Sequence, residues 1–308
     1  MGGKKKNKKR IALQVAGLFF LIVLVGIGVY GFTIYKSLTD TVETMHQPID
    51  REISQKRLEK ITLEKKDPFT VLMLGVDERV GDRGRSDTII VLAVNPNNQS
   101  VKMLSIPRDV RTKIVGHDTV DKINHAYAFG DVKMAMETVE NFLDIPIDYY
   151  LKINMEGFKD IVDAVGGVTL NNDLDFTSNG IHFKKGTINL NGDKALAFSR
   201  MRYEDPNGDF GRQHRQRQII EAIIHEGASL STLTNFGDIF NALGKNVKTN
   251  LNFNEMVDIQ RNYKDASHQI DQISLSGQGT MIDGIYYILV PEKERMRVRG
   301  ILKKQLEI

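Results

Sequence analysis

The sequence predicts an α/β domain in which helices sandwich a mixed sheet, and three observations lead to this prediction. Three apolar, β-branched-rich runs lie close together at residues 69–77, 87–95 and 100–109, as expected of buried strands. Segments with helical periodicity alternate with shorter apolar runs through the rest of the chain. Of the 308 residues, 41% are hydrophobic and 26% are charged, which allows a large core and excludes disordered and fibrous classes.

The first three strands are separated only by a Gly/Asp/Arg-rich loop and by a turn at residues 95–99, so they should form an antiparallel meander. The periodicity gives no internal repeat. Helices are expected within residues 124–144, 155–167, 191–199, 209–228 and 254–266 and from Pro291 onward, and further strands at 147–154, 168–170, 271–277 and 285–290.

The charge is distributed unevenly along the chain. Lys and Arg total 42 against 39 Asp and Glu, but six of the cations lie within residues 4–10. The remaining chain has 36 cations against 39 anions, which removes the main electrostatic argument for nucleic-acid binding. There is no cysteine, so disulfides, thiol catalysis and Cys-based zinc sites are excluded.

Residues 11–35 form an uncharged apolar stretch that is long enough for a helix to cross about 30 Å of hydrocarbon. The stretch exceeds the usual signal-peptide core, and no A-x-A-like cleavage site follows it. We therefore prefer an uncleaved transmembrane signal-anchor to a cleaved secretory signal. The cations before it place the N-terminus in the cytoplasm and everything after Tyr35 outside the cell membrane, a single-pass topology.

Four parts of the chain follow from these features. Residues 36–66 are polar, have balanced charge and contain the helix breaker Pro48, so we expect a partly helical stalk that holds the domain off the bilayer. The predicted parts are a basic cytoplasmic tail (1–10), the transmembrane anchor (11–35), an extracellular stalk (36–66) and an extracellular catalytic domain (67–308).

Two carboxylates and an arginine should meet at one edge of the sheet. In an antiparallel meander the end of the first strand, the start of the second and the end of the third share an edge, so Asp77, Asp87 and Arg108 are expected to cluster. Two carboxylates suit Mg²⁺, which also takes water and phosphate oxygens. The alternative that each carboxylate only caps a turn stays open.

Arginine is concentrated around this edge and in one later segment. Ten of the 17 arginines lie there, whereas none of the 25 lysines falls within residues 77–87, 108–111 or 200–218. This preference indicates bidentate recognition of phosphate, because lysine would serve equally well for solubility. The ten are Arg79, Arg83, Arg85, Arg108, Arg111, Arg200, Arg202, Arg212, Arg215 and Arg217.

The helix that follows Asp209 should extend this cluster into a cleft. Arg212, Gln216, Ile219 and Ile223 fall on one stripe, with Arg215 beside it. Because the isoleucines must face the core, Arg212 and Gln216 should lie where the buried face opens into the cleft.

Several other segments are ambiguous from pattern alone. Gln213 and Arg217 fit the solvated outer face of the same helix. Arg200 and Arg202 point to one side if their segment is extended and diverge if it is helical. Residues 134–142 and 158–165 are interpreted as core helices, although a lipid chain between helix and sheet would give the same periodicity. A metal site, an arginine cluster and a membrane tether together suggest a pyrophosphate-bearing substrate held at the bilayer.

Six ordered motifs resemble those of the LytR-CpsA-Psr family, whose members attach anionic polymers to the bacterial cell wall. They cover about residues 67–225, and the short tail, single anchor and outer domain also match. The likeness is greatest to the teichoic-acid transferase branch, while the C-terminal third carries no transferable motif. The motifs are GVDER, GRSDT, SIPRD, KINHAYA, FSRMR and GDFGRQHRQRQ.

The resemblance implies a mixed α/β fold with a hydrophobic channel for a polyprenyl chain and a clamp for its pyrophosphate. The implied clamp residues are Arg85, Arg108, Arg200, Arg202, Arg212 and Gln216, with Arg79, Lys122, Asn124 and Arg215 as further substrate-binding candidates. Asp77 and Asp87 would lie near Mg²⁺, with Mn²⁺ as an alternative, and the catalytic candidates are Arg85, Arg108 and Asp209.

The activity implied by the resemblance is phosphotransfer. A hydroxyl of peptidoglycan would attack the phosphorus nearest a glycopolymer such as wall teichoic acid, and the polyprenyl phosphate would leave. Mg²⁺ and arginines would stabilise the moving charge without a covalent intermediate. Asp209 and Asp87 are both candidates for accepting the proton.

Two other functions would use the same residues. A membrane-anchored regulatory module would hold polyprenyl pyrophosphates without turning them over, although a cytoplasmic part limited to residues 1–10 is too short for a transcription factor. A polyprenyl pyrophosphatase would transfer the phosphate to water, so only the acceptor distinguishes it from the transferase.

Overall fold

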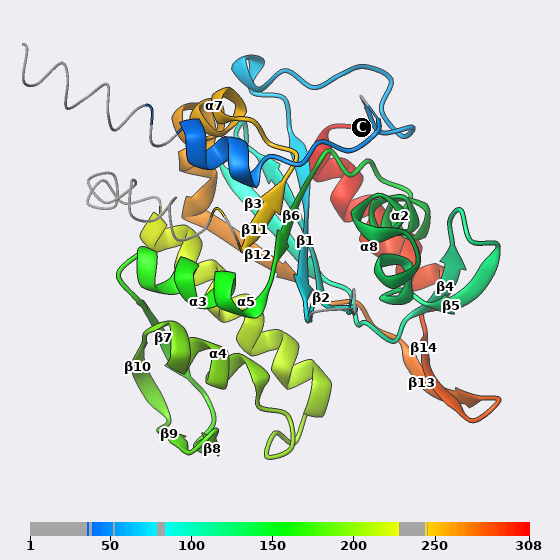
Figure 1. Ribbon diagram of the computed structural model, residues 1–308. Helices are drawn as coiled ribbons and strands as arrows, with labels where there is room; N and C mark the ends of the chain where they lie inside the picture. Colours follow the sequence, from blue (N-terminus) through cyan, green and yellow to red (C-terminus); the bar gives the residue numbers. More distant parts are fainter. Residues whose placement is uncertain (1–35, 37–38, 52, 79–83, 228–243, 245) are drawn as a thin grey trace, which may run out of the picture.

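A central mixed sheet organises the fold. The computed structural model describes residues 36, 39–51, 53–78, 84–227, 244 and 246–308. In this part of the chain the main sheet has six strands in the order β11-β6-β1-β2-β3-β12 (Figure 1). The predicted class, a mixed sheet sandwiched by helices, is confirmed.

The predicted antiparallel meander is also confirmed. β1 (Phe69–Val76) pairs with β2 (Ser86–Asn95), which pairs with β3 (Ser100–Ser105). β3 is shorter than predicted because Pro107 has no N–H to donate to the ladder. The chain turns there, and the Val110 N–H donates to the Pro107 carbonyl at 3.1 Å.

A bulge interrupts the ladder between β1 and β2 at Asp87. Gly75 pairs with Thr88, but the next residue, Val76, pairs with Ser86, so Asp87 is the extra residue. A bulged residue leaves the regular alternation of the strand, which re-aims its side chain. Gly75 is required opposite, because a Cβ there would lie 2.9 Å from the Cβ of Thr88.

Three further strands extend the sheet on both sides of the meander. β6 (Tyr149–Ile153) lies parallel to β1, and β11 (Val247–Thr249) pairs antiparallel with β6. β12 (Gln269–Ile273) lies parallel to β3 at the other edge. The strands predicted at 147–154 and 271–277 are confirmed with shorter bounds, whereas β11 is too short to carry a sequence pattern.

Two helices cover one face of the sheet: α2 (His125–Leu143) and α8 (Glu292–Leu306). Their apolar side chains pack with those of Leu72 and Val91 in one core cluster, which confirms the prediction for residues 134–142. α2 is kinked at Asp131, whose φ of 57° is not helical.

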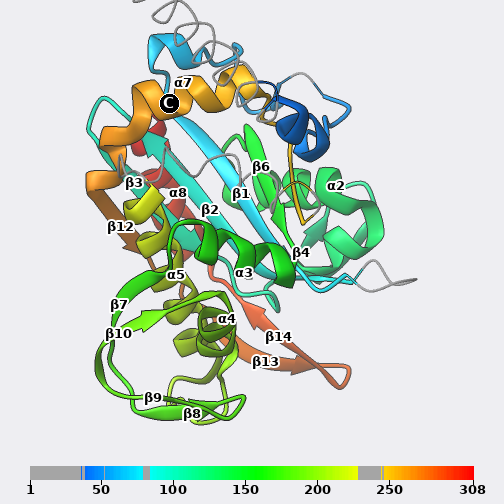
Figure 2. The same cartoon turned by 60° about the vertical axis from the view of Figure 1, so that its left-hand side comes forward.

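Further helices lie across the opposite face, as Figure 2 shows. Asn154 and Asn252 begin two of them, each accepting a hydrogen bond from a backbone N–H of the first turn. The elements on this face are α3 (Met155–Ala164), α5 (Gly208–Gly227), α7 (Phe253–Tyr263) and the 3₁₀ helix η3 (Lys264–His268). They match the helices predicted at 155–167, 209–228 and 254–266.

A smaller lobe continues from α3 and has its own core. Phe176, Phe183 and Phe198 form its centre, with ring centroids 5.1–5.5 Å apart. The lobe contains α4 (Gly192–Arg200), β7 (Val168–Asn172) paired with β10 (Gly186–Leu190), and β8 (Phe176–Ser178) paired with β9 (Ile181–Phe183).

Two short hairpins flank the turn that follows β3. β4 (Arg111–Ile114) pairs with β5 (Thr119–Lys122), and β13 (Gln278–Ile282) pairs with β14 (Ile285–Leu289). The Ile288 N–H donates to the Asp109 carbonyl at 2.8 Å, which joins the second hairpin to the turn. Of these four strands, only β14 was predicted.

The described residues of segment 36–66, where a stalk is predicted, pack against the domain. Residues 39–45 are helical and bury Val42, and the 3₁₀ helix η1 (Leu63–Lys65) packs in a core cluster. Arg51 pairs with Glu140 at 2.7 Å. Apolar side chains distributed through this polar segment thus pack against the domain. That the segment holds the domain off a bilayer stays a prediction.

The predicted transmembrane anchor at residues 11–35 lies outside the described residues, as does the cytoplasmic tail. Among the helices that the structure describes, none has the length and apolar character needed to span a bilayer.

We expect Arg57→Ala to lower the free energy of unfolding by about 3–5 kcal/mol. Arg57 pairs with Asp148 at 2.8 Å, with side chains only 10% and 7% exposed, so the substitution leaves a buried carboxylate without its cation. Urea unfolding followed by circular dichroism measures the loss.

Lys56→Ala is the matched control for this experiment. Lys56 pairs with Asp144 at 2.6 Å, but the side chains are 40% and 31% exposed, so its loss should cost less than about 1 kcal/mol. Equal losses in the two variants would show that the segment does not stabilise the domain through Arg57.

Candidate active site

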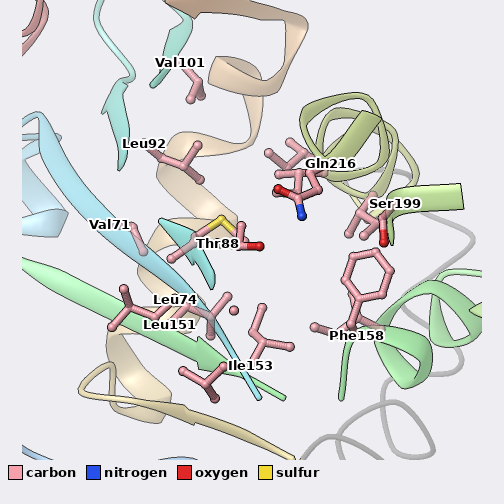
Figure 3. A pocket seen from close by; sticks show the side chains of 18 of the residues that line it. Val71, Leu74, Thr88, Leu92, Val101, Leu151, Ile153, Phe158, Ser199 and Gln216 are labelled. Carbon is pink, nitrogen blue, oxygen red and sulfur yellow. The ribbon is translucent and has the colours of Figure 1, made fainter. Parts of the chain in front are cut away.

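A cavity of about 760 Å³ lies between the sheet and the helices on its second face. Val71, Leu92 and Leu151 form part of its strand wall, and Phe158 of α3 lies across from them (Figure 3). The residues lining it are mainly apolar and include Phe69, Met73, Val94, Val101, Ile153, Ile161, Ile220, Ile223, Ile224, Met256 and Ile259. The cavity therefore suits a hydrocarbon ligand.

The cavity is elongated because it follows β1 from Phe69 to Asp77. An eight-residue strand spans roughly 26 Å. Phe158 and Ile161, which we expected in a closed core, line this space instead. The alternative interpretation of their periodicity, an apolar space between helix and sheet, is the one that the fold contains.

Charged groups gather at the end of the cavity where β1 ends and β2 begins. Arg108 Nη1 donates to Asp87 Oδ1 at 2.9 Å, and Asp77 lines the same end. The predicted convergence of these three residues is confirmed. Burial opposes the charge of Arg108, but nearby carboxylates, chiefly Asp87, outweigh burial and raise its pKa.

Arg212 brings a second guanidinium to this end from α5. Its Nη2 lies 2.6 Å from Asp209 Oδ1, while Gln213 Nε2 donates to Asp209 Oδ2 at 2.9 Å. Burial lowers the pKa of Arg212, and the cations Arg108 and Arg202 act in the same direction. The Arg212 Nε is buried without a hydrogen-bond partner among the described residues. A buried cation with an unpaired donor is suited to an anion.

Arg200, Arg202 and Gln216 complete the polar end of the cavity. Arg200 is the last residue of α4, and Met201 leaves the helix with ψ of 134°, so Arg202 also reaches the cavity. The segment is thus helical up to Arg200 and extended after it, and both arginines line the site. Gln216 points into the cavity from α5 (Figure 3).

Arg215 lies away from the cavity, which corrects its prediction as a substrate-binding residue. Its side chain is 5% exposed and forms an ion pair with Asp205. Its Nε donates to the Phe198 carbonyl at 3.1 Å, and its Nη2 donates to the Met201 carbonyl. Gly211 permits this packing, because a Cβ there would lie 1.9 Å from Asp205 Oδ2. Arg215 thus fixes the connection between α4 and α5.

The stripe predicted along α5 is confirmed for Arg212, Gln216 and Ile223, which line the cavity. Ile219 packs in the core of the neighbouring lobe. Gln213 is buried, contrary to the prediction of an exposed outer position, because its amide holds Asp209.

Lys122 and Asn124 lie beside the turn that carries Arg108 and are not among the residues that line the cavity. Lys122 Nζ pairs with Asp109 Oδ1 at 2.6 Å, and Arg108 Nε lies 3.7 Å from the other oxygen of Asp109. The Asn124 N–H donates to the Arg108 carbonyl at 3.3 Å. In this structure both residues support the turn that carries Arg108.

The loop between β1 and β2 carries the remaining predicted residues. Arg85 is exposed, and its carbonyl accepts a hydrogen bond from the Asp77 N–H at 3.4 Å. Arg79 lies outside the described residues, so its position stays a prediction.

Asp77 and Asp87 are the residues that could hold a metal ion. Both line the polar end of the cavity together with Arg200, Arg202 and Arg212. Mg²⁺ prefers one or two carboxylates with water and phosphate oxygens, and two carboxylates beside several arginines fit that pattern. The described residues contain no group of three or more His, Asp or Glu side chains suited to a metal. The pair therefore fits an ion whose coordination the substrate completes.

The sequence model of the LytR_cpsA_psr family matches residues 32–304. The chain belongs to the LytR_cpsA_psr family. Among its relatives, a polyisoprenyl-teichoic acid--peptidoglycan teichoic acid transferase TagU from Bacillus mycoides (strain KBAB4) is 50% identical over 302 residues, which is 98% of this chain and 99% of the relative. The likeness to the teichoic-acid transferase branch inferred from the six motifs is confirmed.

Solved structures resemble this member of the LytR_cpsA_psr family over most of its length. The crystal structure of B. subtilis TagU is 50% identical, with a TM-score of 0.65, and the match covers 79% of this chain and 98% of that one. A structure of TagT bound to LIIa-WTA is 32% identical, with a TM-score of 0.74, and covers 85% and 100% of the two chains.

The motifs of the LytR_cpsA_psr family locate the polar end but not the far wall of the cavity. Met256, Ile259 and Tyr263 of α7 line that wall and were missed. Their spacing of three and four residues gives α7 one apolar stripe, which is the signal that could have found them. No comparable signal identifies Asp205 as the partner of Arg215.

We expect Arg215→Met to destabilise the fold much more than Arg212→Met. Arg215→Met leaves Asp205 buried without its cation and should cost about 3–5 kcal/mol of unfolding free energy. Arg212→Met also takes the cation from Asp209, but that carboxylate is 28% exposed and keeps its hydrogen bond from Gln213. Because Arg212 is itself desolvated beside other cations, its loss should cost no more than about 1 kcal/mol. Urea unfolding of both variants checks this, and a large loss for Arg212→Met would assign it a structural role.

Proposed function

We propose that this enzyme transfers an anionic glycopolymer, wall teichoic acid, from a polyprenyl-pyrophosphate carrier to a hydroxyl of peptidoglycan. It is a transferase, as its TagU relatives are named. The observation that carries the proposal is one elongated apolar cavity whose polar end gathers arginines and carboxylates. TagT, a relative of the same fold, is bound to LIIa-WTA, which supports a substrate of this class.

The polyprenyl chain would occupy the apolar length of the cavity beside β1. Leu92, Ile153 and Ile220 come from the sheet and from α5, so hydrocarbon would replace water on both sides. Burying apolar surface contributes about 25 cal/mol per Å² and has no directional requirement. The chain would thus bring the substrate to the site, while the polar end would orient it.

The pyrophosphate would bind between the guanidinium groups of Arg108, Arg202 and Arg212. The unpaired Nε of Arg212 supports this placement, since a phosphate oxygen would satisfy it. Arg200 and Gln216 would contact further oxygens, and the predicted roles of Arg79 and Arg85 remain part of the proposal. These groups would stabilise charge that moves onto the leaving phosphate.

The reaction would be a direct displacement at phosphorus. The oxygen of the acceptor hydroxyl forms a bond to the phosphorus that carries the glycopolymer, the bond from that phosphorus to the bridging oxygen breaks, and polyprenyl phosphate leaves. The hydroxyl proton passes to a carboxylate. Asp209 already accepts from Gln213 and pairs with Arg212, while Asp87 pairs with Arg108, and both remain candidates.

Asp77 and Asp87 would hold Mg²⁺ or Mn²⁺ together with phosphate oxygens. When bound, the ion supplies a positive charge that neutralises those oxygens. The bulge at Asp87 supports this role, because it removes the carboxylate from the regular alternation of β2 at the polar end.

We further propose a single-pass location in the cell membrane, with the N-terminus in the cytoplasm and the domain outside. The apolar stretch at residues 11–35 and the basic tail before it support this topology. Such a tether would hold the cavity near its lipid substrate and the peptidoglycan acceptor.

The transfer itself can be measured with the purified full-length protein, a polyprenyl-pyrophosphate-linked teichoic-acid precursor, Mg²⁺ and peptidoglycan oligomers. We expect polymer covalently attached to glycan, and EDTA should abolish the attachment. Arg108→Ala should slow it by at least about 100-fold, because one charged donor to the reacting phosphates is lost.

Arg261→Ala is the matched control, since Arg261 is exposed on α7 away from the polar end. It should leave the rate unchanged. Cleavage of the lipid at the same rate without peptidoglycan would indicate a pyrophosphatase instead. Tight binding of the lipid without its cleavage, under conditions where a TagU relative transfers the polymer, would indicate a binding module.

We expect Val71→Trp to weaken binding of long-chain polyprenyl pyrophosphate by about tenfold or more, because the indole would fill the cavity beside β1. Inorganic pyrophosphate should bind unchanged, which isothermal titration calorimetry can measure. Val120→Trp places the same ring on an exposed strand and is the control. Equal lipid affinity in both variants would exclude the cavity as the chain-binding site.

A further inference from the structure

Tyr203 is a large aromatic residue left in water at the polar end of the cavity. It is 92% exposed, yet it belongs to the cavity lining next to Arg202. Burying a side chain of this size is strongly favourable, and among the described large hydrophobic side chains only that of Leu58 is more exposed. Neither its packing nor the phosphate clamp explains its position.

The backbone that carries Tyr203 is held firmly despite this exposure. The Asp205 N–H donates to the Arg202 carbonyl at 3.4 Å, and the Gly208 N–H donates to the Asp205 carbonyl at 2.9 Å. The Asp205 carboxylate pairs with the buried Arg215. The ring therefore projects from a fixed turn, which reduces the entropy lost when a ligand stacks on it.

Arg202 lies beside the ring, with its guanidinium carbon 5.1 Å from the ring centroid. This contact is within the range of a cation–π interaction and holds the ring next to a phosphate-binding group. The apolar face of a pyranose presents C–H groups whose hydrogens carry a small positive charge. These groups stack on the electron-rich face of an aromatic ring, while the sugar hydroxyls stay in water.

We propose that Tyr203 binds a pyranose ring at the phosphate held by Arg202. This inference deepens the proposed function and rests on it. The cavity combines apolar walls, arginines and, exposed to water beside Arg202, this ring. These three kinds of surface correspond to the hydrocarbon, phosphate and sugar parts of the proposed substrate. The pyranose is either the sugar attached to the carrier phosphate or the acceptor sugar that approaches it.

Calorimetry with two probes separates the sources: polyprenyl pyrophosphate alone, and the same lipid carrying one N-acetylhexosamine. The full-length wild type is compared with Tyr203→Ala, Tyr203→Phe and Tyr286→Ala. Tyr286 is also an exposed tyrosine, on β14, and is the control. A transfer assay on the same variants gives the KM for peptidoglycan oligomers.

If the donor sugar stacks on Tyr203, Tyr203→Ala loses about tenfold in affinity for the sugar-bearing lipid only, and Tyr203→Phe keeps it. If the acceptor sugar stacks, lipid affinities stay the same and the KM for peptidoglycan rises about tenfold. No difference from Tyr286→Ala in either measurement, or an equal loss with the bare lipid, overturns the inference. Failure of wild type to bind the bare lipid would overturn the proposed function instead.

Discussion

The bulge at Asp87 in the ladder between β1 and β2 is the constraint on which the polar end of the cavity depends. Up to Gly75 the two strands pair regularly, and their side chains alternate between the α2 face and the cavity. One extra residue then breaks the alternation, and Asp87 meets Arg108 from the end of β3. If these strands were parallel, the start of β2 would lie at the opposite edge from the ends of β1 and β3, and Asp87 would not meet Arg108.

The arginines at this edge gain their positions from tertiary packing rather than from mutual attraction. Arg108 and Arg212 repel each other in a partly desolvated space, and burial adds to the cost for Arg212. Asp87 and Asp209 compensate part of that cost. The net excess of positive charge would attract a polyanionic ligand. Binding of such a ligand would lower the repulsion among the guanidinium groups.

Much of this fold follows from sequence pattern, because long apolar runs and amphipathic helices have strong periodicity. Strand direction alone predicts the meander and places Asp77 and Asp87 at one edge of the sheet. Helical spacing alone predicts α5. Arg215 could not be separated from Arg212 in that way, since an arginine beside the apolar stripe looks the same whether it faces a ligand or a buried Asp205. The short hairpins and the packing of residues 39–66 depend on contacts distant in sequence, which local pattern does not contain.

α5 supplies both the head and the tail contacts of the cavity from one rigid element. Arg212 and Gln216 lie on the same face as Ile220 and Ile224, so the two kinds of contact are separated by a fixed rise of about 1.5 Å per residue. A helix of this length does not stretch, so with the proposed substrate bound it would fix the distance between the phosphates and the first part of the hydrocarbon chain. Differences in the far part of the hydrocarbon chain would not affect this spacing. Altered geometry close to the phosphates would misalign the phosphates with Arg212 or the hydrocarbon with Ile220.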